Sequence, residues 1–473
     1  MAAPEDPAGR IDQDGPVGRA ERRRTVVAAS AGNFAEWYDW GVYGVVATVV
    51  ADKFFPPGND TLALLSAYAV FAISYLTRPL GATVFGHIGD KLGRKRALST
   101  TIIITCGATA LIGFIPTYAV IGYAAPVLLL LMRLIQSFGT GGEYSTAISF
   151  VYEHGQKGRK ATAVGMMTAM TFGGFIVGSL LATLLSATLS SAAYEAWGWR
   201  LLFWLSLPMG VVGLYLRRRT AEGREFRQLL EAQEQQRERH KRQSPVWEAL
   251  RTHGARILVF VAFLGTWAII SATMTSYLAT FLKGNSALSG TQSYGINTLN
   301  SVMVVVCLLA FCPVADRIGL RRATIVGSLV VAVGVVPGFA LASSGVTAAW
   351  LGGALLGLCK GVMAVPSLLA VSQIFPAHIR VTAGGLSYNV AQALLGGTAP
   401  LIGVWLNSVT GSALFFSSYL VLAALVTLVI TLVCGRRWIA DSESHSGDAG
   451  STTRDASAAA QAAAGVPNGI VTR

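Results

Sequence analysis

Charged residues are scarce in this chain. Asp, Glu, Lys and Arg make up 13% of its 473 residues, while hydrophobic residues make up 53%. A soluble protein carries about 25% charged residues, so this composition excludes an ordinary soluble domain. The mean hydropathy of +0.53 is typical of a chain that crosses a bilayer several times.

Histidine, cysteine and nucleotide-binding patterns are also missing where catalysis would need them. The six histidines all lie in polar joints or tails, and the five cysteines fall in apolar runs without the spacing of a zinc or redox site. The sequence contains no glycine-rich nucleotide loop and no nucleophile beside a base. We therefore expect no enzyme activity, no metal site and no cofactor.

The chain has instead a series of apolar runs separated by short polar joints. Each run is close to the length that an α-helix needs to cross a bilayer. The sequence therefore predicts an all-α polytopic membrane protein with twelve transmembrane helices. The twelve runs cover residues 25–51, 62–86, 97–116, 124–150, 160–186, 200–216, 257–282, 293–313, 323–342, 347–373, 381–407 and 413–434.

Positive charge is distributed unevenly among the joints. If the N-terminus is cytoplasmic and the chain alternates sides, the inner joints hold 27 Lys and Arg residues and the outer joints hold two, Lys53 and Lys283. This asymmetry follows the positive-inside rule. It predicts a multi-pass protein of the cell (inner) membrane with both termini cytoplasmic. The net charge of +13 then reflects topology, and no nucleic-acid partner is expected.

One long charged joint divides the runs six and six. It predicts an N-terminal half at residues 25–216 and a C-terminal half at 257–434, joined by a cytoplasmic loop at 217–256. Residues 1–24 and 435–473 are predicted to be cytoplasmic tails. The second tail is rich in Ser, Ala and Gly, which predicts disorder.

A repeat supports this division. GHIGDKLGRKRA at the end of the second run corresponds to CPVADRIGLRRA at the end of the eighth, at an offset of 226 residues. An Asp in such a loop can cap a neighbouring helix and form a contact between the halves that breaks in another state. Stop-transfer charges and a tight glycine turn would explain the same residues. The matched pairs are Asp90 with Asp316, Gly93 with Gly319, and Arg96 with Arg322.

Several longer stretches resemble one transporter family. They include GNFAEWYDWGVYG in the first run, RLIQSFGTGGEYSTA in the fourth and IFPAHIRVTAGGLSYNVAQALLGG leading into the eleventh. With the matched loops, they are similar to the metabolite:proton symporter family of the major facilitator superfamily, which includes α-ketoglutarate, citrate, shikimate and proline/betaine permeases. FFPPGN and the eleventh-run stretch look most like the α-ketoglutarate permease. The resemblance covers about residues 25–437 and implies two six-helix halves around a central site.

Six charged residues lie inside the apolar runs. Each costs about 2.5–3.5 kcal/mol at the centre of a lone helix, so each is expected to face the interior of the bundle. All but one belong to the N-terminal half. These residues are Glu36, Asp39, Arg78, Arg133, Glu143 and Lys360.

Asp39 and Glu36 are the candidates for proton coupling, and only one of them is expected to face the cavity. The helical rise places Asp39 and Arg133 at similar depth. Asp39 can titrate there, because burial favours the neutral acid and a nearby arginine favours the carboxylate. A substrate anion at the arginine would weaken that pairing and favour proton uptake. A static ion pair is the structural alternative. The resemblance implies the same arrangement, since sugar/proton symporters use a similar Asp and Arg.

A second group is predicted to bind the substrate. A guanidinium binds a carboxylate through two parallel hydrogen bonds, so Arg78 and Arg133 are assigned to an anion, with Lys360 as a third cation. Alternatively, Arg78 could snorkel toward the inner headgroups and Lys360 could pair with a helix end. The aromatic residues assigned to the same site, with packing as their alternative, are Trp37, Tyr38 and Tyr43.

Cytoplasmic gating is predicted for charged residues at the inner loops. In the superfamily that the chain resembles, an acid and a base that close the fourth-to-fifth and tenth-to-eleventh joints look like a latch. The second of these joints has Gln373 in place of the acid. The predicted gating residues are Asp90, Gly93, Arg94, Arg96, Glu143, Glu153, Arg159, Asp316, Arg322 and Arg380.

Together these features predict a proton-coupled importer of a small organic anion that works by alternating access. A di- or tricarboxylate such as 2-oxoglutarate or citrate is the first choice, and the protein is expected to act as a monomer in the lipid bilayer. Shikimate or proline/betaine symport is one alternative, although the three cations and the lack of heptads in the tail argue against the osmoprotectant branch. A proton antiporter exporting a drug or secondary metabolite is another, although such exporters usually place acidic groups in an apolar pocket.

Overall fold

Helix is the only regular secondary structure among the described residues. The structure is a computed structural model that describes residues 34, 36–81, 84–85, 88, 94–140, 148, 151–152, 158–220, 245–285, 288–375, 380–412 and 414–434. Within these ranges, residues 94–98, 216–220, 245–250, 285 and 380–382 are described by their backbone alone.

In the N-terminal half, each of the six predicted runs overlaps a helix of the described chain. The connections include the short helices α6 (Tyr118–Ile121) and α10 (Ser191–Ala193) and the π-helical turn η2 (Tyr194–Gly198). The spanning elements are residues 36–45 leading into α2 (Ala47–Phe54), α3 (Asp60–Ser74) with the 3-10 turn η1 (Tyr75–Thr77), α5 (Arg94–Ile112), α7 (Ala124–Gly139), α9 (Lys160–Thr188), and α11 (Trp199–Trp204) with α12 (Ser206–Thr220).

The C-terminal half repeats this pattern. Its described elements are α14 (Pro245–Phe263), α15 (Gly265–Ala272), the π-helical turn η3 (Thr273–Tyr277), α16 (Leu278–Asn285), α17 (Gly290–Ser343), α18 (Val346–Gln373), α19 (Arg380–Ala391), the π-helical turn η4 (Gln392–Gly396), α20 (Ala399–Thr410) and a last helix, Phe415–Cys434.

Seven continuous helical stretches of the described chain are long and apolar enough to cross a membrane, and one of them, α17, holds two of the predicted runs. Its 54 residues change direction at Gly319, where φ is +77° and ψ is 165°. A side chain would be strained at this φ, whereas glycine adopts it freely. Gly319 therefore forms the tight turn that the repeated loop predicts.

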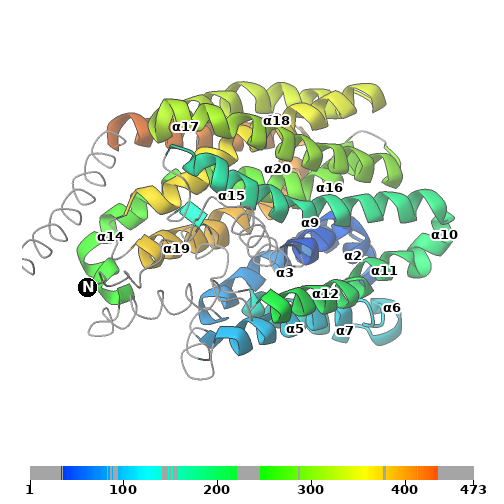
Figure 1. The fold of residues 1–473 in the computed structure, drawn as a ribbon. Helices are drawn as coiled ribbons and strands as arrows, with labels where there is room; N and C mark the ends of the chain where they lie inside the picture. Colours follow the sequence, from blue (N-terminus) through cyan, green and yellow to red (C-terminus); the bar gives the residue numbers. More distant parts are fainter. Residues whose placement is uncertain are drawn as a thin grey trace, which may run out of the picture.

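The helix axes are roughly aligned with one another, as Figure 1 shows. The helices α17, α18 and α20 lie on one side of the bundle, and α5, α7 and α12 lie on the other. The two halves meet where α9 packs against α17 and where α3 packs against α20. The prediction of two six-helix halves is confirmed by this arrangement together with the structural relatives described below.

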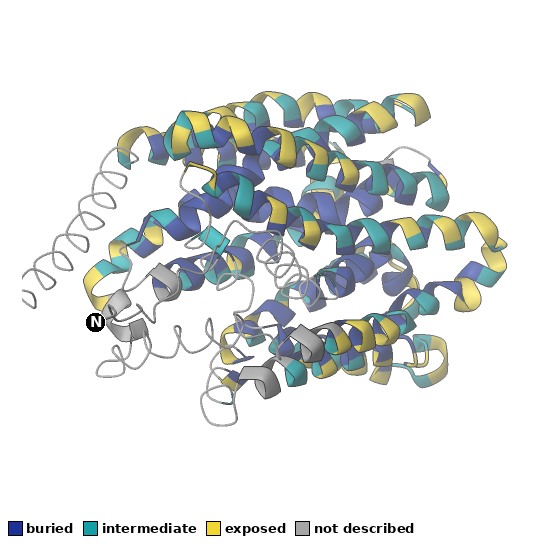
Figure 2. Ribbon diagram, viewed as in Figure 1, coloured by how far each residue is buried: buried dark blue, intermediate teal, exposed yellow. Residues whose placement is uncertain are grey.

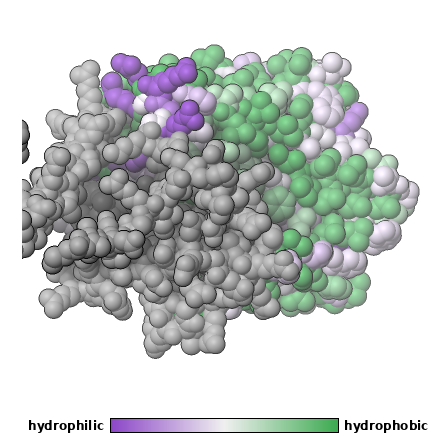
Figure 3. Space-filling view, in the orientation of Figure 1, coloured by the Kyte–Doolittle hydropathy of each residue, from purple (hydrophilic) through white to green (hydrophobic). Residues whose placement is uncertain are grey.

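Burial separates the interior helices from the outer ones (Figure 2). In Arg251–Gly284 and Val346–Gln373, 78% of the most apolar window is buried, against 33–44% in the other five stretches. The outer helices expose large apolar side chains such as Val211, Val333 and Val433. Figure 3 shows this hydrophobic surface over much of the described chain on one face, with hydrophilic residues gathered toward one end. Such a surface suits the hydrocarbon interior of a bilayer.

A glycine allows the two halves to approach closely at Gly44. A Cβ atom at this position would lie 2.5 Å from the Cα atom and 2.6 Å from the Cβ atom of Ser276, in the other half. Tyr68 of α3 reaches the same segment, where its hydroxyl donates to the Ser276 carbonyl at 2.7 Å. Farther along, the hydroxyls of Ser179 and Thr298 lie 2.8 Å apart. These contacts join the halves toward the predicted outer end.

We expect Gly44→Leu to destabilise this contact, because its side chain would overlap backbone that cannot rotate away. Overpacking of this kind costs about 1–3 kcal/mol. The measurement is thermal unfolding of the purified protein in detergent. Gly107→Leu is the matched control, since no atom lies within 4 Å of a Cβ placed at Gly107. Equal melting temperatures for the two variants would contradict the prediction.

Asp316 joins the halves at the predicted cytoplasmic end. This residue belongs to α17 in the C-terminal half, and its carboxylate caps the beginning of α9 in the N-terminal half. One carboxylate oxygen accepts from the backbone N–H of Ala161 at 2.7 Å. The other accepts from the backbone N–H and the hydroxyl of Thr162, at 3.1 and 2.6 Å. A carboxylate at a helix N-terminus is also favoured by the helix dipole.

Asp316→Asn is expected to weaken this contact, because an amide has one acceptor oxygen where the carboxylate uses two. Loss of an N-terminal cap costs about 0.5–2 kcal/mol, which corresponds to roughly a 2- to 30-fold shift between closed and open states. Spin-label distances between the predicted cytoplasmic ends of α9 and α17 would report it. Asp60→Asn, in the first turn of α3 within one half, is the control. Identical distance distributions in the two variants would refute the role of Asp316.

Candidate functional site

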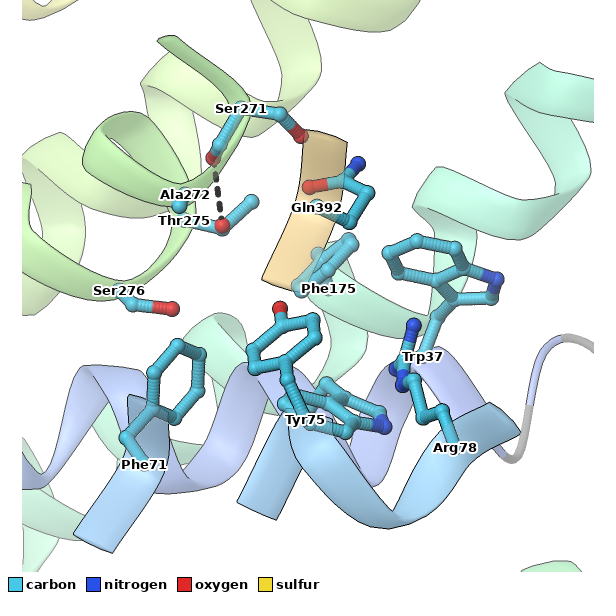
Figure 4. A pocket seen from close by; sticks show the side chains of 11 residues that line it. Trp37, Phe71, Tyr75, Arg78, Phe175, Ser271, Ala272, Thr275, Ser276 and Gln392 are labelled. Atoms are coloured by element: carbon cyan, nitrogen blue, oxygen red, sulfur yellow. Dashed lines mark hydrogen bonds between the residues drawn. The ribbon is translucent and has the colours of Figure 1, made fainter. Parts of the chain in front are cut away.

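A cavity with about 350 Å³ of empty space lies between the two halves, and Figure 4 shows its side chains. The N-terminal half contributes five aromatic rings and one cation, and the C-terminal half contributes small polar groups and an amide. No carboxylate is among the described residues that line it. The lining residues are Trp37, Trp40, Phe71, Tyr75, Arg78, Phe175, Ser271, Ala272, Thr275, Ser276 and Gln392.

Helical spacing explains the wall from the N-terminal half. Phe71, Tyr75 and Arg78 are four and then three residues apart along α3 and η1, so they share one helix face. Trp37 and Trp40 are three residues apart in the first span. These two faces meet, since the Trp40 ring packs against Phe71 and Tyr75 with centroid distances of 5.3 and 4.6 Å.

Two π-helical turns form much of the opposite wall. Thr275 and Ser276 belong to η3, and Gln392 belongs to η4. A π-helical turn widens the backbone and often occurs at functional sites. The Thr275 hydroxyl donates to the carbonyl of Ser271 at 2.6 Å, and Gln392 donates to the Tyr388 hydroxyl at 3.1 Å. This wall therefore offers hydrogen-bonding groups without charge.

Arg78 is the cation that lines the cavity. Its guanidinium lies 4.2 Å from the ring centroid of Trp40 and 4.6 Å from that of Tyr75. Its Nε atom has no hydrogen-bond partner among the described residues. Cation–π contacts of this kind contribute about 2 kcal/mol or more when desolvated. Arg78 is thus held by rings, and no acid among the described residues forms an ion pair with it.

Arg133 is fully buried behind the aromatic wall. Its guanidinium lies over Tyr43, Trp40 and Phe71, at 4.2, 4.7 and 5.2 Å from the ring centroids. One terminal nitrogen donates to the side-chain oxygen of Gln136. Both predicted arginines therefore contact Trp40, but Arg133 is not among the residues that line the cavity.

Asp39 lies close to Arg133 without forming an ion pair. Its charge is near enough to interact with those of Arg133 and Glu36, and the Thr109 hydroxyl lies beside its carboxylate. Neither Asp39 oxygen has a hydrogen-bond partner of ordinary geometry among the described residues. The structural alternative of a fixed Asp39–Arg133 pair is thus absent from this conformation of the described chain. Asp39 and Glu36 are both buried, and neither lines the cavity.

Lys360 is buried in α18, at the junction of the two halves. Its Nζ atom donates to the Ser271 carbonyl at 3.4 Å and lies 4.6 and 5.6 Å from the ring centroids of Phe172 and Phe175. Ser271 and Phe175 line the cavity, so Lys360 stands directly behind two of its lining residues. The acceptor, Ser271, lies in the last turn of α15, so the alternative that Lys360 pairs with a helix end stays open beside its assignment to the substrate.

The three predicted aromatic residues have different positions. Trp37 lines the cavity and packs against Phe175 at 5.4 Å. Tyr38 donates its hydroxyl to the Leu202 carbonyl at 2.7 Å, and Tyr43 donates to the Ala67 carbonyl at 2.8 Å. The two tyrosines join the first span to its neighbours and are not among the lining residues, so their assignment to substrate remains a prediction.

The predicted gating residues are only partly within the described chain. Asp316 makes the contact with α9 described above, Arg159 is the exposed N-cap residue of that helix, and Arg322 is exposed. Arg94, Arg96 and Arg380 are described by their backbone alone. The predictions for Asp90, Gly93, Glu143 and Glu153 fall outside the described residues.

Sequence reasoning missed most of the lining. It weighed charged residues and the neighbours of Asp39, whereas the cavity also uses aromatic rings and uncharged polar groups. The spacing from Arg78 along its own helix would have identified Phe71 and Tyr75. Buried amides within apolar runs, Gln136 and Gln392, were a second available signal, since an amide inside a membrane needs a partner.

Comparison with known proteins identifies the family of this chain. A profile of the Major Facilitator Superfamily matches residues 29–306. The chain is 32% identical over 418 residues to the glycine betaine/proline/ectoine/pipecolic acid transporter OusA of Dickeya dadantii, covering 87% of this chain and 82% of that protein. It is also 32% identical over 419 residues to the proline/betaine transporter of Escherichia coli K12, covering 86% and 82%.

Solved structures show the same fold. The xylose transporter XylE from E. coli, in a partially occluded inward-open conformation, superposes with a TM-score of 0.67 at 15% identity, covering 88% of this chain and 98% of that one. A D-xylose–proton symporter superposes with a TM-score of 0.67 at 17% identity, covering 86% and 97%. The predicted resemblance is confirmed at the level of the superfamily, and proline/betaine permeases were among the resemblances named. The chain is a multi-pass membrane transporter that belongs to the Major Facilitator Superfamily.

Proposed function

We propose that this protein is a proton-coupled symporter that takes up a small zwitterion, such as betaine or proline, across the cell membrane. One observation carries the proposal. The cavity presents a single guanidinium and five aromatic rings, with no carboxylate among its described lining residues. A zwitterion with one carboxylate and one cationic nitrogen has the complementary pair of groups.

The chemistry of each wall supports this class. Arg78 can bind the substrate carboxylate through two parallel hydrogen bonds. The face of Trp37 attracts a quaternary or secondary ammonium, because the π-face of an aromatic ring is negative. Trp40 and Tyr75 instead hold the guanidinium of Arg78. Thr275 and Gln392 can accept or donate hydrogen bonds from the opposite side.

The relatives support the same class of substrate. Two transporters that are 32% identical to this chain over more than four-fifths of its length are named for proline and betaine. The first is also named for ectoine and pipecolic acid. Substrate identity can change with a few lining residues, so the names add to the argument from the cavity and do not replace it.

Coupling to protons is assigned to Asp39, with Arg133 as its electrostatic neighbour. Trp40 contacts both Arg78 at the cavity and Arg133 behind it. A substrate carboxylate at Arg78 therefore acts on the same aromatic cluster that packs against Arg133. Protonation of Asp39 removes a buried negative charge before the halves reorient, which lowers the cost of carrying that charge through an apolar environment. Breaking the Asp316 contact would then open the cytoplasmic end.

A small dicarboxylate is the second candidate, favoured by three buried cations in the spans. Arg78 alone lines the cavity, while Arg133 and Lys360 lie behind aromatic side chains. A second substrate carboxylate would need one of these two to move past a ring. The conformation described here therefore favours one carboxylate over two.

Purified protein in proteoliposomes should accumulate labelled betaine or proline when an inward proton gradient is imposed. We expect Asp39→Asn to abolish accumulation while keeping exchange of substrate across the membrane, because exchange needs no net proton release. Wild-type uptake of 2-oxoglutarate and citrate is measured beside it. If either acid accumulates and neither betaine nor proline does, the substrate is an organic anion and the proposed zwitterion is wrong. Gradient-driven accumulation by Asp39→Asn equal to wild type would remove Asp39 as the proton carrier.

Removal of one cavity ring should separate betaine from proline. We expect Trp37→Leu to raise the apparent KM for betaine by about 2- to 30-fold, which corresponds to the loss of a cation–π contact of roughly 0.5–2 kcal/mol. The effect on proline should be smaller, since its ammonium keeps N–H groups for hydrogen bonding. Trp197→Leu is the control, because Trp197 is 44% exposed and lies outside the cavity. Equal KM values for betaine in the two variants would argue against recognition by rings.

A further inference from the structure

The charged residues Arg133 and Asp39 are linked by two uncharged side chains on neighbouring helices. Arg133 donates to the side-chain oxygen of Gln136, one turn farther along α7. The Gln136 amide nitrogen donates to the Thr109 hydroxyl of α5 at 2.6 Å. Thr109 itself lies beside the Asp39 carboxylate. All four side chains are buried, with exposed fractions of 1% or less.

The order of donors along this chain follows from the hydroxyl. Thr109 donates its proton to the carbonyl of Thr105 at 2.9 Å, so its oxygen is free to accept. The Gln136 side chain must therefore turn its NH₂ group toward Thr109, which leaves its oxygen for Arg133. A reversed amide would place NH₂ against a guanidinium that has only donors. Thr109 thus determines the orientation in which Gln136 can hold Arg133.

This arrangement depends on the protonation of Asp39. A protonated Asp39 can donate its O–H to the second lone pair of Thr109, and the chain of donors then ends on the Thr105 carbonyl. After the proton leaves, the carboxylate can only accept, so the Thr109 hydroxyl turns toward it and releases Thr105. Arg133 retains two nitrogens, Nε and Nη2, without a partner among the described residues, so it can also turn toward the new charge.

We propose that Thr109 and Gln136 are positioning residues that hold Arg133 away from Asp39 and so set the pH at which Asp39 exchanges its proton. The inference rests on the proposed proton-coupled symport. Gln136 suits this role because it is neutral: it orients Arg133 while leaving the guanidinium charge uncancelled. The charged and titratable groups that face Asp39 in the described chain are Glu36 and Tyr38 from its own segment and Arg133 from α7.

The test is the pH profile of substrate uptake by Gln136→Leu in proteoliposomes. Without the amide, Arg133 is free to pair with Asp39, and the pair favours the carboxylate. We expect the pH of half-maximal uptake to fall by about one unit, a tenfold change in proton concentration. Thr109→Val removes both the acceptor for Gln136 and a donor to the Asp39 carboxylate, two effects of opposite sign, so its shift should be smaller than that of Gln136→Leu. Thr109→Ser, which keeps the hydroxyl, should have the profile of wild type.

Two further variants separate positioning from packing. Residues that act through one chain are not additive, so the double variant Thr109→Val with Gln136→Leu should shift no farther than the larger single shift. Thr168→Val is the matched control, because Thr168 is also fully buried and its hydroxyl donates only to the Val164 carbonyl. Its pH profile should equal that of wild type.

The proposal is overturned if Gln136→Leu is folded and its pH profile is that of wild type, or if the two shifts add in the double variant. Lower maximal uptake at an unchanged pH profile would also overturn it, since that is the effect of packing alone. Infrared titration of the carboxyl stretching band that disappears in Asp39→Asn reads the same proton without any substrate. If wild type transports neither betaine nor proline, the proposed function fails while this titration still tests the role of Gln136.

Discussion

The structure depends on how two buried arginines are stabilised without an ion pair to any acid that the structure describes. Arg78 and Arg133 both lie against the ring of Trp40, and neither forms an ion pair with Asp39 in the described chain. An ion pair would offset desolvation more strongly but would also cancel the charge. Aromatic faces and a neutral amide stabilise each guanidinium and leave its charge available to a ligand or to a titrating carboxylate. This requirement explains why the first and second spans are so rich in aromatic residues.

A cavity of this kind also requires two halves that touch and separate. Gly44 brings the first span against the backbone of Ser276, which lines the cavity. Asp316 holds the other end by three hydrogen bonds to the start of α9. The contact at Gly44 is a close steric approach, and the contact at Asp316 consists of hydrogen bonds. Both are small in comparison with the extensive apolar packing within each half. Contacts of modest energy between rigid bodies allow an equilibrium between states, because neither state is stabilised by more than a few kcal/mol.

Hydropathy and charge predicted the fold because they are local properties. Each apolar run meets a helix, and the repeated glycine at Gly319 adopts the positive φ of a turn. The site was less predictable, because helical periodicity assigns residues to a face and does not say which neighbouring helix that face meets. Tyr38 precedes Asp39 directly and Tyr43 follows it by four residues, yet both contact carbonyls of other spans. The sequence marks Gln136 as an amide inside an apolar run, but its contact with Thr109 follows only from the packing of α5 against α7.

The substrate class was hard to predict from the sequence for the same reason: the sequence does not show which side chains reach the cavity. Three cations inside the spans favour an anion with several carboxylates if all of them reach one space. In the structure, Phe71 and Tyr43 cover Arg133, and Phe172 and Phe175 cover Lys360. A ligand in the cavity therefore contacts one guanidinium among aromatic rings, and of these rings Trp37 is suited to bind a positive nitrogen. The cations behind the wall then act on the potential of the site and on Asp39, while selectivity is set by the groups that reach the cavity.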